Sequence, residues 1–373
     1  MKNLSHYLKN SSVGLAQLAL KSGLSESRLR AIREGNVLPS YSELRSISDT
    51  LNLPTSFLLS EYIEDPNYKV LFRKQLGSTT DEKVVNNFNF YIDNIIALKP
   101  DLSKVEDIRS KIQPLPNTYP NAEALAFFFR QEYFDNNHFD PLISLPSLLS
   151  NKLGFIVKVI ELGKNADGAS AIINNLVFLI LSPRFIGRML FTLAHELGHI
   201  LNHHEPGDFI YVDKKINLNP KDDKQKIEGF ANAFASCLLL PEKGVAILLN
   251  KVREINQISS NSPLSDIEIL YLSRFYGVSF DVAGFRCEAL GLLPKGGSYS
   301  LSQQIRLDFD SAEKRADQLG IPSREEVNFP QAPDFILDKA IDLIEKEEYS
   351  IGKIANLLSI SVNTLLEHHT KIG

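Results

Sequence analysis

The sequence predicts a mainly helical protein with one small β-sheet, an α+β fold. Apolar residues recur at helical spacing along most of the 373 residues, whereas short β-branched runs are concentrated between residues 154 and 181. Turn-rich stretches divide the chain further. We expect an all-α head at residues 1–65, a helical connector at 66–119, a domain holding the sheet at 120–295, and a helical C-terminal module at 296–373.

Composition and patterning favour a cytoplasmic protein. The two cysteines, Cys237 and Cys287, lie in apolar helical patterns that are typical of buried thiols rather than of a disulfide framework. Residues 1–10 contain no apolar signal core. The longest dense apolar run, at 176–181, is too short to span a bilayer. We therefore expect no membrane partner, and the sequence does not indicate an oligomeric state.

The head begins with two short predicted helices joined by a glycine turn. Residues 15–23 have helical spacing and end at a glycine, and a second helix is predicted at 26–33. Ser25 is a suitable N-cap for the second helix, and Leu29 with Ile32 forms its buried face. This pattern is typical of a helix-turn-helix, whose second helix enters the major groove of DNA.

The head is also more basic than the rest of the chain. Residues 1–60 carry seven Lys and Arg against four acidic residues, a net charge of +3, whereas the whole chain carries −5. This asymmetry favours duplex DNA as a partner of the head. The expected base readers are Glu26, Ser27 and Arg28, and the expected phosphate contacts are Arg30 and Arg33. The alternative is a basic helical face used for protein contacts.

Small and turn-forming residues punctuate the head: Ala19, Gly23-Leu24-Ser25, Ile32 to Gly35, Pro39-Ser40 and Leu51-Asn52-Leu53-Pro54. Through these residues the segment from about 12 to 60 resembles the Xre/Cro-type repressor domain. The resemblance implies a small all-α fold that binds DNA. That family usually has a phosphate-binding glutamine at the start of the first motif helix, where this chain has Leu15.

The segments on either side of the central domain are predicted to be helical. Upstream, residues 84–96 have clear helical periodicity, and 113–120, with three prolines in eight residues, is the best candidate for a domain boundary. Downstream, residues 294–300 are interpreted as a linker, followed by amphipathic helices at 335–344 and 351–361. The last of these resembles half of a helix-turn-helix. Because it has few basic residues, we interpret the C-terminal module as a protein-contact surface rather than a DNA-binding one.

Three strands are predicted within the central domain. Residues 154–160, 169–173 and 176–181 are short, apolar and rich in β-branched side chains, and Asn174-Asn175 suits a tight turn between the last two. An edge strand at this place could hold an extended peptide by main-chain pairing. The alternative is that the sheet only packs the helices, and the sequence does not separate the two.

The most informative motif is His-Glu-Leu-Gly-His at 195–199, set within an apolar stretch. On a helix, His195 and His199 lie on one face and can hold one metal ion. Glu196 then lies close enough to act on a water bound to that metal. Two neutral imidazoles and a nearby carboxylate are what a zinc peptidase uses to activate water near neutral pH.

A catalytic zinc site needs a third protein ligand. Glu228, at the start of an apolar helix predicted at 228–240, is the best candidate, although a carboxylate there also suits the helix N-terminus. His203 and His204 are the rival ligands. Asn232, four residues after Glu228, is expected to orient a ligand by a hydrogen bond. For the second oxyanion donor the sequence offers three unranked candidates, which are His204, Tyr211 and Tyr271.

Several motifs occur together in the central domain: Ala194 to His203, Glu228 to Pro241, Ala124 to Arg130, Asp140 to Ile143, Leu272 to Ser279, and Arg286 to Leu292. Through them residues 120–295 resemble the ImmA/IrrE family of zinc metallopeptidases. The resemblance implies a zincin-like helical domain whose Zn²⁺ is held by two histidines and a glutamate, with Glu196 as general base. It also implies a protein substrate, typically a DNA-bound repressor.

The combined interpretation is a zinc-dependent endopeptidase fused to a DNA-binding head, which regulates transcription by cleaving a repressor. The alternative is a DNA-binding regulator, or an antitoxin, whose peptidase-like domain is a sensor or scaffold and cleaves nothing. An intact His-Glu-x-x-His motif disfavours the alternative, because a scaffold does not need Glu196.

Overall fold

The structure is a computed structural model that describes residues 4, 8, 15–51, 55–59, 82–103, 105–134, 139–162, 166–203, 209–213 and 223–372. The chain divides into two compact units, residues 1–70 and 71–373. Helices dominate the described residues of both units, and the second unit also holds a small sheet. The predicted α+β class is therefore confirmed. The segments predicted as connector, central domain and C-terminal module all contribute to the second unit, which begins at residue 71.

The described part of the first unit is helical. Ser25 caps the second of its helices, since its Oγ accepts a hydrogen bond from the backbone N–H of Arg28 at 3.2 Å. Gly23 and Gly35 follow the first two helices with φ of +70° and +78°, a region that favours glycine. The helices are α2 (Leu15–Ser22), α3 (Glu26–Arg33), α4 (Tyr41–Leu51) and α5 (Thr55–Leu59), and their buried residues include Leu18, Leu29, Ile32, Leu44, Ile47 and Leu58.

The sheet of the second unit has the strand order β1-β3-β2-β4 among the described residues. β1 pairs parallel with β3, and β2 pairs antiparallel with both of its neighbours. Asn174 and Asn175 turn the chain between β2 and β3 with φ of 50° and 66°, as a type I′ turn requires. The three predicted strands and their turn are confirmed, whereas β4 was not predicted. The strands are β1 (Ile156–Val159), β2 (Gly168–Ile173), β3 (Leu176–Leu181) and β4 (Phe209–Asp213).

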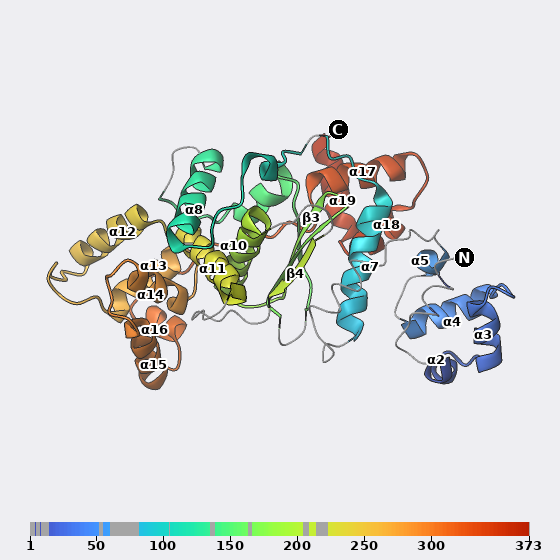
Figure 1. The fold of residues 1–373 in the computed structure, drawn as a ribbon, viewed down its shortest axis with the longest axis horizontal. Helices are drawn as coiled ribbons and strands as arrows, with labels where there is room; N and C mark the ends of the chain where they lie inside the picture. The colour runs from blue at the N-terminus through green and yellow to red at the C-terminus, as the bar shows by residue number, and fades with distance from the viewer. Residues whose placement is uncertain are drawn as a thin grey trace. The chain divides into compact units, whose positions relative to one another are not determined.

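Helix α10 (Ile186–Asn202) is the central element of the second unit. It packs against β2 and β3, and also against α11 (Asp223–Leu239), so that it lies between the sheet and α11 (Figure 1). Helix α8 (Tyr119–Tyr133) packs in turn on α11. The other elements are α7 (Glu82–Leu98), η1 (Ile108–Lys111), α9 (Leu145–Ser147), η2 (Leu148–Lys152), α12 (Glu242–Ile255), α13 (Asp266–Phe275), α14 (Phe280–Ala289), α15 (Gly297–Phe309), α16 (Ala312–Gln318), α17 (Asp334–Glu345), α18 (Ile351–Leu358) and α19 (Val362–Ile372).

The stretch at 294–300 is not a simple linker, and this prediction was wrong. Helix α15 already begins at Gly297. The carboxylate of Glu288 accepts hydrogen bonds from the backbone N–H groups of Gly296 and Ser298, at 3.1 and 2.8 Å. A carboxylate is a favourable partner for the N–H groups at a helix N-terminus, and this partner lies too far away in sequence for the local pattern to show it.

The C-terminal helices are joined to the sheet through a buried lysine. Lys158 of β1 donates hydrogen bonds from Nζ to the carbonyl oxygens of Gln331, Leu358 and Ser359, at 3.0, 3.2 and 2.9 Å. Burial lowers the pKa of Lys158 to about 8. Helices α17 and α18 also pack on α7. The predicted C-terminal module is thus anchored on the same unit as the sheet.

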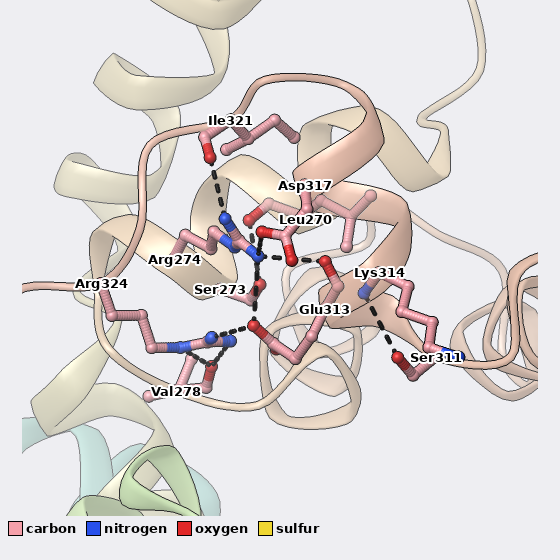
Figure 2. Close-up of polar contacts among 10 residues, drawn as sticks. All are labelled: Leu270, Ser273, Arg274, Val278, Ser311, Glu313, Lys314, Asp317, Ile321 and Arg324. Carbon is pink, nitrogen blue, oxygen red and sulfur yellow. Dashed lines mark hydrogen bonds and ion pairs between the residues drawn. The ribbon is translucent and has the colours of Figure 1, made fainter.

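Two arginines organise the segment that follows α15. Arg274 donates to the carbonyl oxygen of Ile321 at 2.8 Å and to the carboxylates of Asp317 and Glu313, at 2.5 and 3.3 Å (Figure 2). Glu313 is shared, since Arg324 Nη1 also donates to it, at 2.6 Å. Side chains from α13 and α16 are therefore linked by one charged network.

This charged network reaches the N-terminal end of α10. Arg324 donates to the carbonyl oxygen of Val278 at 2.9 Å, and its guanidinium lies 4.9 Å from the ring centroid of Phe185, the N-cap residue of α10. Gly187 lies so close to this segment that a Cβ would be 2.9 Å from the carbonyl carbon of Val278. The start of α10 is thus held against the turn between α13 and α14.

Candidate metal centre

Helix α10 places the His-Glu-x-x-His motif in the core of the second unit. From Met189 to Asn202 every residue of the helix is buried, which is why the sequence is apolar around the motif. His195, Glu196 and His199 are each 0% exposed. Buried polar side chains need partners, so the surroundings of these three residues determine what they can do.

Helix α11 brings Glu228 to the two histidines. Glu228 Oε2 lies 3.4 Å from His195 Nε2 and 3.9 Å from His199 Nε2. The ligand atoms of the three residues all lie within 4.8 Å of one another. The glutamate side chain is 24% exposed whereas both imidazoles are fully buried, so among the described residues the cluster is exposed on its carboxylate side. Two imidazole nitrogens and one carboxylate oxygen with an open side form a donor set that fits catalytic Zn²⁺.

Hydrogen bonds orient both imidazoles. His195 Nδ1 lies 2.9 Å from Asn232 Oδ1, an acceptor, so this nitrogen donates and Nε2 presents its lone pair toward Glu228. The two Nε2 atoms lie 3.0 Å apart. Burial, with smaller contributions from His195 and His203, lowers the pKa of His199 well below its ordinary value. Neutral imidazole is the form that binds metal.

Glu196 does not belong to the cluster of converging ligand atoms. Its carboxylate lies against the start of β2, where a Cβ on Gly168 would be 2.6 Å from Glu196 Oε1 and 2.6 Å from Thr192 Cγ2. Only glycine leaves room for the carboxylate at this point of the strand. The first residue of β2 therefore leaves room for the Glu196 carboxylate, and the sheet also packs on α10.

Of the two rival ligands, His203 is described and does not belong to the converging cluster. His203 Nδ1 contacts His199 Nδ1 at 3.0 Å, on the ring edge opposite the Nε2 atom that faces Glu228. Burial, then His195, lowers the pKa of His203 to about 4. His204 lies outside the described residues. Of the candidate oxyanion donors, Tyr271 is on α13, and the side chain of Tyr211, in β4, is not described.

Two buried arginines hold the C-terminal end of α11, the helix that carries Glu228. Arg130 of α8 donates from Nε to the carbonyl oxygen of Leu238 at 2.6 Å. Arg286 of α14 donates from Nε to the carbonyl oxygen of Leu240 at 2.9 Å. Both cations satisfy carbonyls that a helix end leaves without partners in the helix, and both suit its negative end.

One comparison with known proteins found a match in the part of the sequence that holds this site. Residues 182–288 match the family model of the IrrE N-terminal-like domain, Peptidase_M78. The matched segment holds His195, Glu196, His199 and Glu228. The match supports an ImmA/IrrE-like domain with a metallopeptidase-like function at these residues, which we call the IrrE-like domain. No curated protein matched the chain.

In the head, the expected DNA contacts lie on α3. Glu26, Ser27 and Arg30 are exposed. Arg28 instead forms two hydrogen bonds with the carboxylate of Glu43, at 2.8 and 3.0 Å, and so has a role within the domain. Arg33 Nη2 lies 3.9 Å from Glu34. DNA reading by any of these residues stays a prediction.

Within the described ranges, no single helix is long and apolar enough to cross a membrane. Helix segments Lys226–Leu239 and Glu242–Ile255 pass such a test only as a pair bent by 50°. The first of them carries Glu228 and is packed between α8 and α10.

Sequence reasoning missed the residues that orient the cluster from outside α10 and α11. Asn117 lies in a proline-rich stretch, and Gly168 is the first residue of a strand. Neither place has a local pattern that indicates a site. His203 was considered only as a ligand. Its spacing of four residues from His199 indicates contact on a helix, and in the structure this contact is a hydrogen bond between the two rings.

Proposed function

We propose that this chain is a zinc-dependent endopeptidase with a DNA-binding head. The observation that carries the proposal is the convergence of His195, His199 and Glu228 beside a buried Glu196, inside a segment that matches a peptidase family model. A carboxylate ligand with two neutral imidazoles leaves a fourth position for water or substrate, which is the arrangement of a catalytic rather than a structural zinc site.

Zn²⁺ bound at this cluster would supply a Lewis acid that polarises the scissile carbonyl and makes water acidic enough to attack near neutral pH. Glu196 takes a proton from the attacking water as its oxygen bonds to the carbonyl carbon. Glu196 then passes the proton to the amine nitrogen as the C–N bond breaks. Asn232 keeps the ring of His195 in the required orientation throughout.

The edge strand β4 offers a place for an extended peptide. β4 pairs with β2 on one side only among the described residues, and its last residue, Asp213, lies opposite Gly168, the residue against Glu196. A substrate strand that added to this edge would lie two strand spacings, about 10 Å, from β2, on the side of the sheet edge nearest to β4. This supports an extended protein segment as the substrate.

The head would bring the enzyme to DNA, and a DNA-bound repressor is the protein substrate that we propose. The basic charge of residues 1–60 and the exposed Arg30 on α3 support the DNA contact. If phosphates dominate binding, affinity for duplex DNA should fall steeply with salt.

The decisive experiment compares Glu196→Gln with Glu228→Gln. Glu196→Gln should keep bound zinc but lower cleavage of a library of proteome-derived peptides by about a hundredfold or more, as for loss of a general base. Glu228→Gln should lower zinc content itself, because an amide is a poorer ligand than a carboxylate. Glu242→Gln, an exposed glutamate on α12, is the matched control and should behave as wild type.

The outcome separates enzyme from scaffold. Wild-type protein without bound zinc would overturn the metal site. Zinc binding with no cleavage, or cleavage that survives Glu196→Gln, would overturn the proposed hydrolysis.

A further inference from the structure

The proline-rich segment before α8 is bound to the C-terminal end of α10. We call residues 115–117 the strap. Asn202 of α10 accepts a hydrogen bond at Oδ1 from the backbone N–H of Leu115, at 2.7 Å, and donates from Nδ2 to the carbonyl oxygen of the same residue, at 3.0 Å. One amide side chain thus pairs with both backbone groups of Leu115, as a neighbouring strand would.

This pairing sets the direction of the hydrogen bonds that follow. A backbone N–H only donates and a carbonyl oxygen only accepts, so the Asn202 amide is fixed with Nδ2 as the donor. Nδ2 also lies 3.1 Å from the Asn117 side chain, which must therefore present its acceptor, Oδ1. The same Oδ1 lies 2.7 Å from His203 Nε2, so that nitrogen of His203 must carry a proton.

The same assignment of donors and acceptors extends from His203 to His199 of the metal cluster. A neutral His203 with its proton on Nε2 has an acceptor at Nδ1, and His199 Nδ1 lies 3.0 Å away and donates to it. The proton of neutral His199 is then on Nδ1, and its Nε2 presents a lone pair to the point where Glu228 Oε2 and His195 Nε2 converge. The tautomer that a metal requires is determined by an asparagine of the strap.

We propose that Asn117 and His203 are positioning residues for the metal centre, and that the strap thereby sets the metal affinity of the IrrE-like domain. The inference rests on the proposed metal site. A hydrogen bond to the non-ligating nitrogen of a histidine ligand fixes its ring and raises its basicity, and the loss of such a partner typically lowers metal affinity 10- to 100-fold.

The strap is placed to act on both ligand helices. Through Asn117 and His203 it contacts His199 of α10. Thr118, the next residue, caps α8, which packs on α11, the helix that bears Glu228. A displacement of the strap would therefore disturb the two sides of the cluster together.

The test measures Zn²⁺ affinity of the full chain by competition with a fluorescent chelator. Asn117→Ala and His203→Phe each remove one link, and Phe suits position 203 because the His203 ring already packs edge-on against Phe230 at 5.3 Å. Both variants should bind Zn²⁺ about 10- to 100-fold more weakly. Asn117→Asp retains the acceptor oxygen and should restore affinity to within a few fold of wild type.

Asn121→Ala is the matched control. Asn121 also holds the strap with an amide, donating from Nδ2 to the carbonyl oxygen of Pro116 at 2.9 Å, but it takes no part in the chain to His199. Its Zn²⁺ affinity should stay within about twofold of wild type. Urea unfolding of the metal-free proteins shows whether any loss of affinity merely follows a loss of folded protein.

The outcomes are distinct. Wild-type affinity in both Asn117→Ala and His203→Phe overturns the inference while leaving the metal site intact. Equal losses in Asn117→Asp or Asn121→Ala overturn it as well, because they would show a general role in packing. A wild-type chain that binds no Zn²⁺ overturns the proposed function, and this inference with it.

Discussion

The two ends of α10 are held by networks of opposite chemistry. At the N-terminal end, Arg324 and Arg274 share the carboxylate of Glu313 (Figure 2). At the C-terminal end, Asn202, His203 and Asn117 form a network of neutral groups. Charged groups attract each other in many arrangements, whereas neutral ones bond only where each donor faces an acceptor.

The two ends of α10 therefore affect different properties: the charged end the stability of the fold, and the neutral end the placement of protons at the metal cluster. The charged network joins elements and can be expected to contribute mainly to the free energy of unfolding. In the neutral network the donor and the acceptor of each hydrogen bond are fixed, because each proton has one allowed position. Variants at the two ends should therefore affect different measurements.

The largest expected effect is on stability at the charged end. Arg274→Met removes a buried cation, whose side chain is 6% exposed, and leaves the carbonyl oxygen of Ile321 without its donor. The free energy of unfolding should fall by about 2–3 kcal/mol. Urea denaturation measures this loss, and Zn²⁺ affinity should stay within about twofold of wild type.

Lys314→Met is the control for Arg274→Met, since the ion pair of Lys314 with Asp310 is exposed and its loss should change the urea midpoint little. A large drop in Zn²⁺ affinity in folded Arg274→Met protein would show that the two ends are coupled, and the comparison would fail.

A smaller effect is expected at the neutral end. Asn202→Leu keeps the size of the side chain but removes both hydrogen bonds to Leu115 and the one to Asn117. Zn²⁺ affinity should fall about three- to tenfold, less than for Asn117→Ala, because the bond between Asn117 and His203 remains. Chelator competition measures it, and an effect larger than that of Asn117→Ala would mean that the strap acts on the metal by another route.

The smallest effect concerns the buried Lys158, whose hydrogen-bond partners among the described residues are neutral. Lys158 donates to three carbonyl oxygens, and burial lowers its pKa to about 8, below the ordinary 10.5 of the unfolded chain. Between pH 8 and 10.5 the unfolded state binds more protons, so the contribution of Lys158 to stability should rise with pH. Urea unfolding at pH 7.5 and 9.5 should show this gain relative to Lys158→Met, and parallel curves for the two proteins would contradict it.

Local patterns sufficed for much of the fold. The strands at β1, β2 and β3, their Asn-Asn turn and the helix with its cap at Ser25 depend on residues that are neighbours in sequence, and all were predicted. The start of α15 was mispredicted because its partner, Glu288, comes from the preceding helix. β4 was missed even though its residues, Phe-Ile-Tyr-Val-Asp, are typical of a strand.

The candidate site divides in the same way. The spacing of His195 and His199 on one helix requires no tertiary information, whereas the distance of Glu228 from them depends on how α11 packs on α10. The strap could not be found from sequence, because a proline-rich stretch is equally typical of a linker. The contact of Arg28 with Glu43, 15 residues later, likewise became visible only in the fold.

The two arginines on the end of α11 also bear on the order in which the protein is made. Arg130 lies 108 residues before its partner Leu238, and Arg286 lies 46 residues after Leu240. A nascent chain that has emerged only as far as residue 280 already contains all three candidate metal ligands but not Arg286, which bonds the C-terminal end of α11. Contacts of such long sequence separation form late in folding. A nascent chain that stops short of α14 therefore has the candidate ligands but lacks one of the two arginines that bond the end of α11.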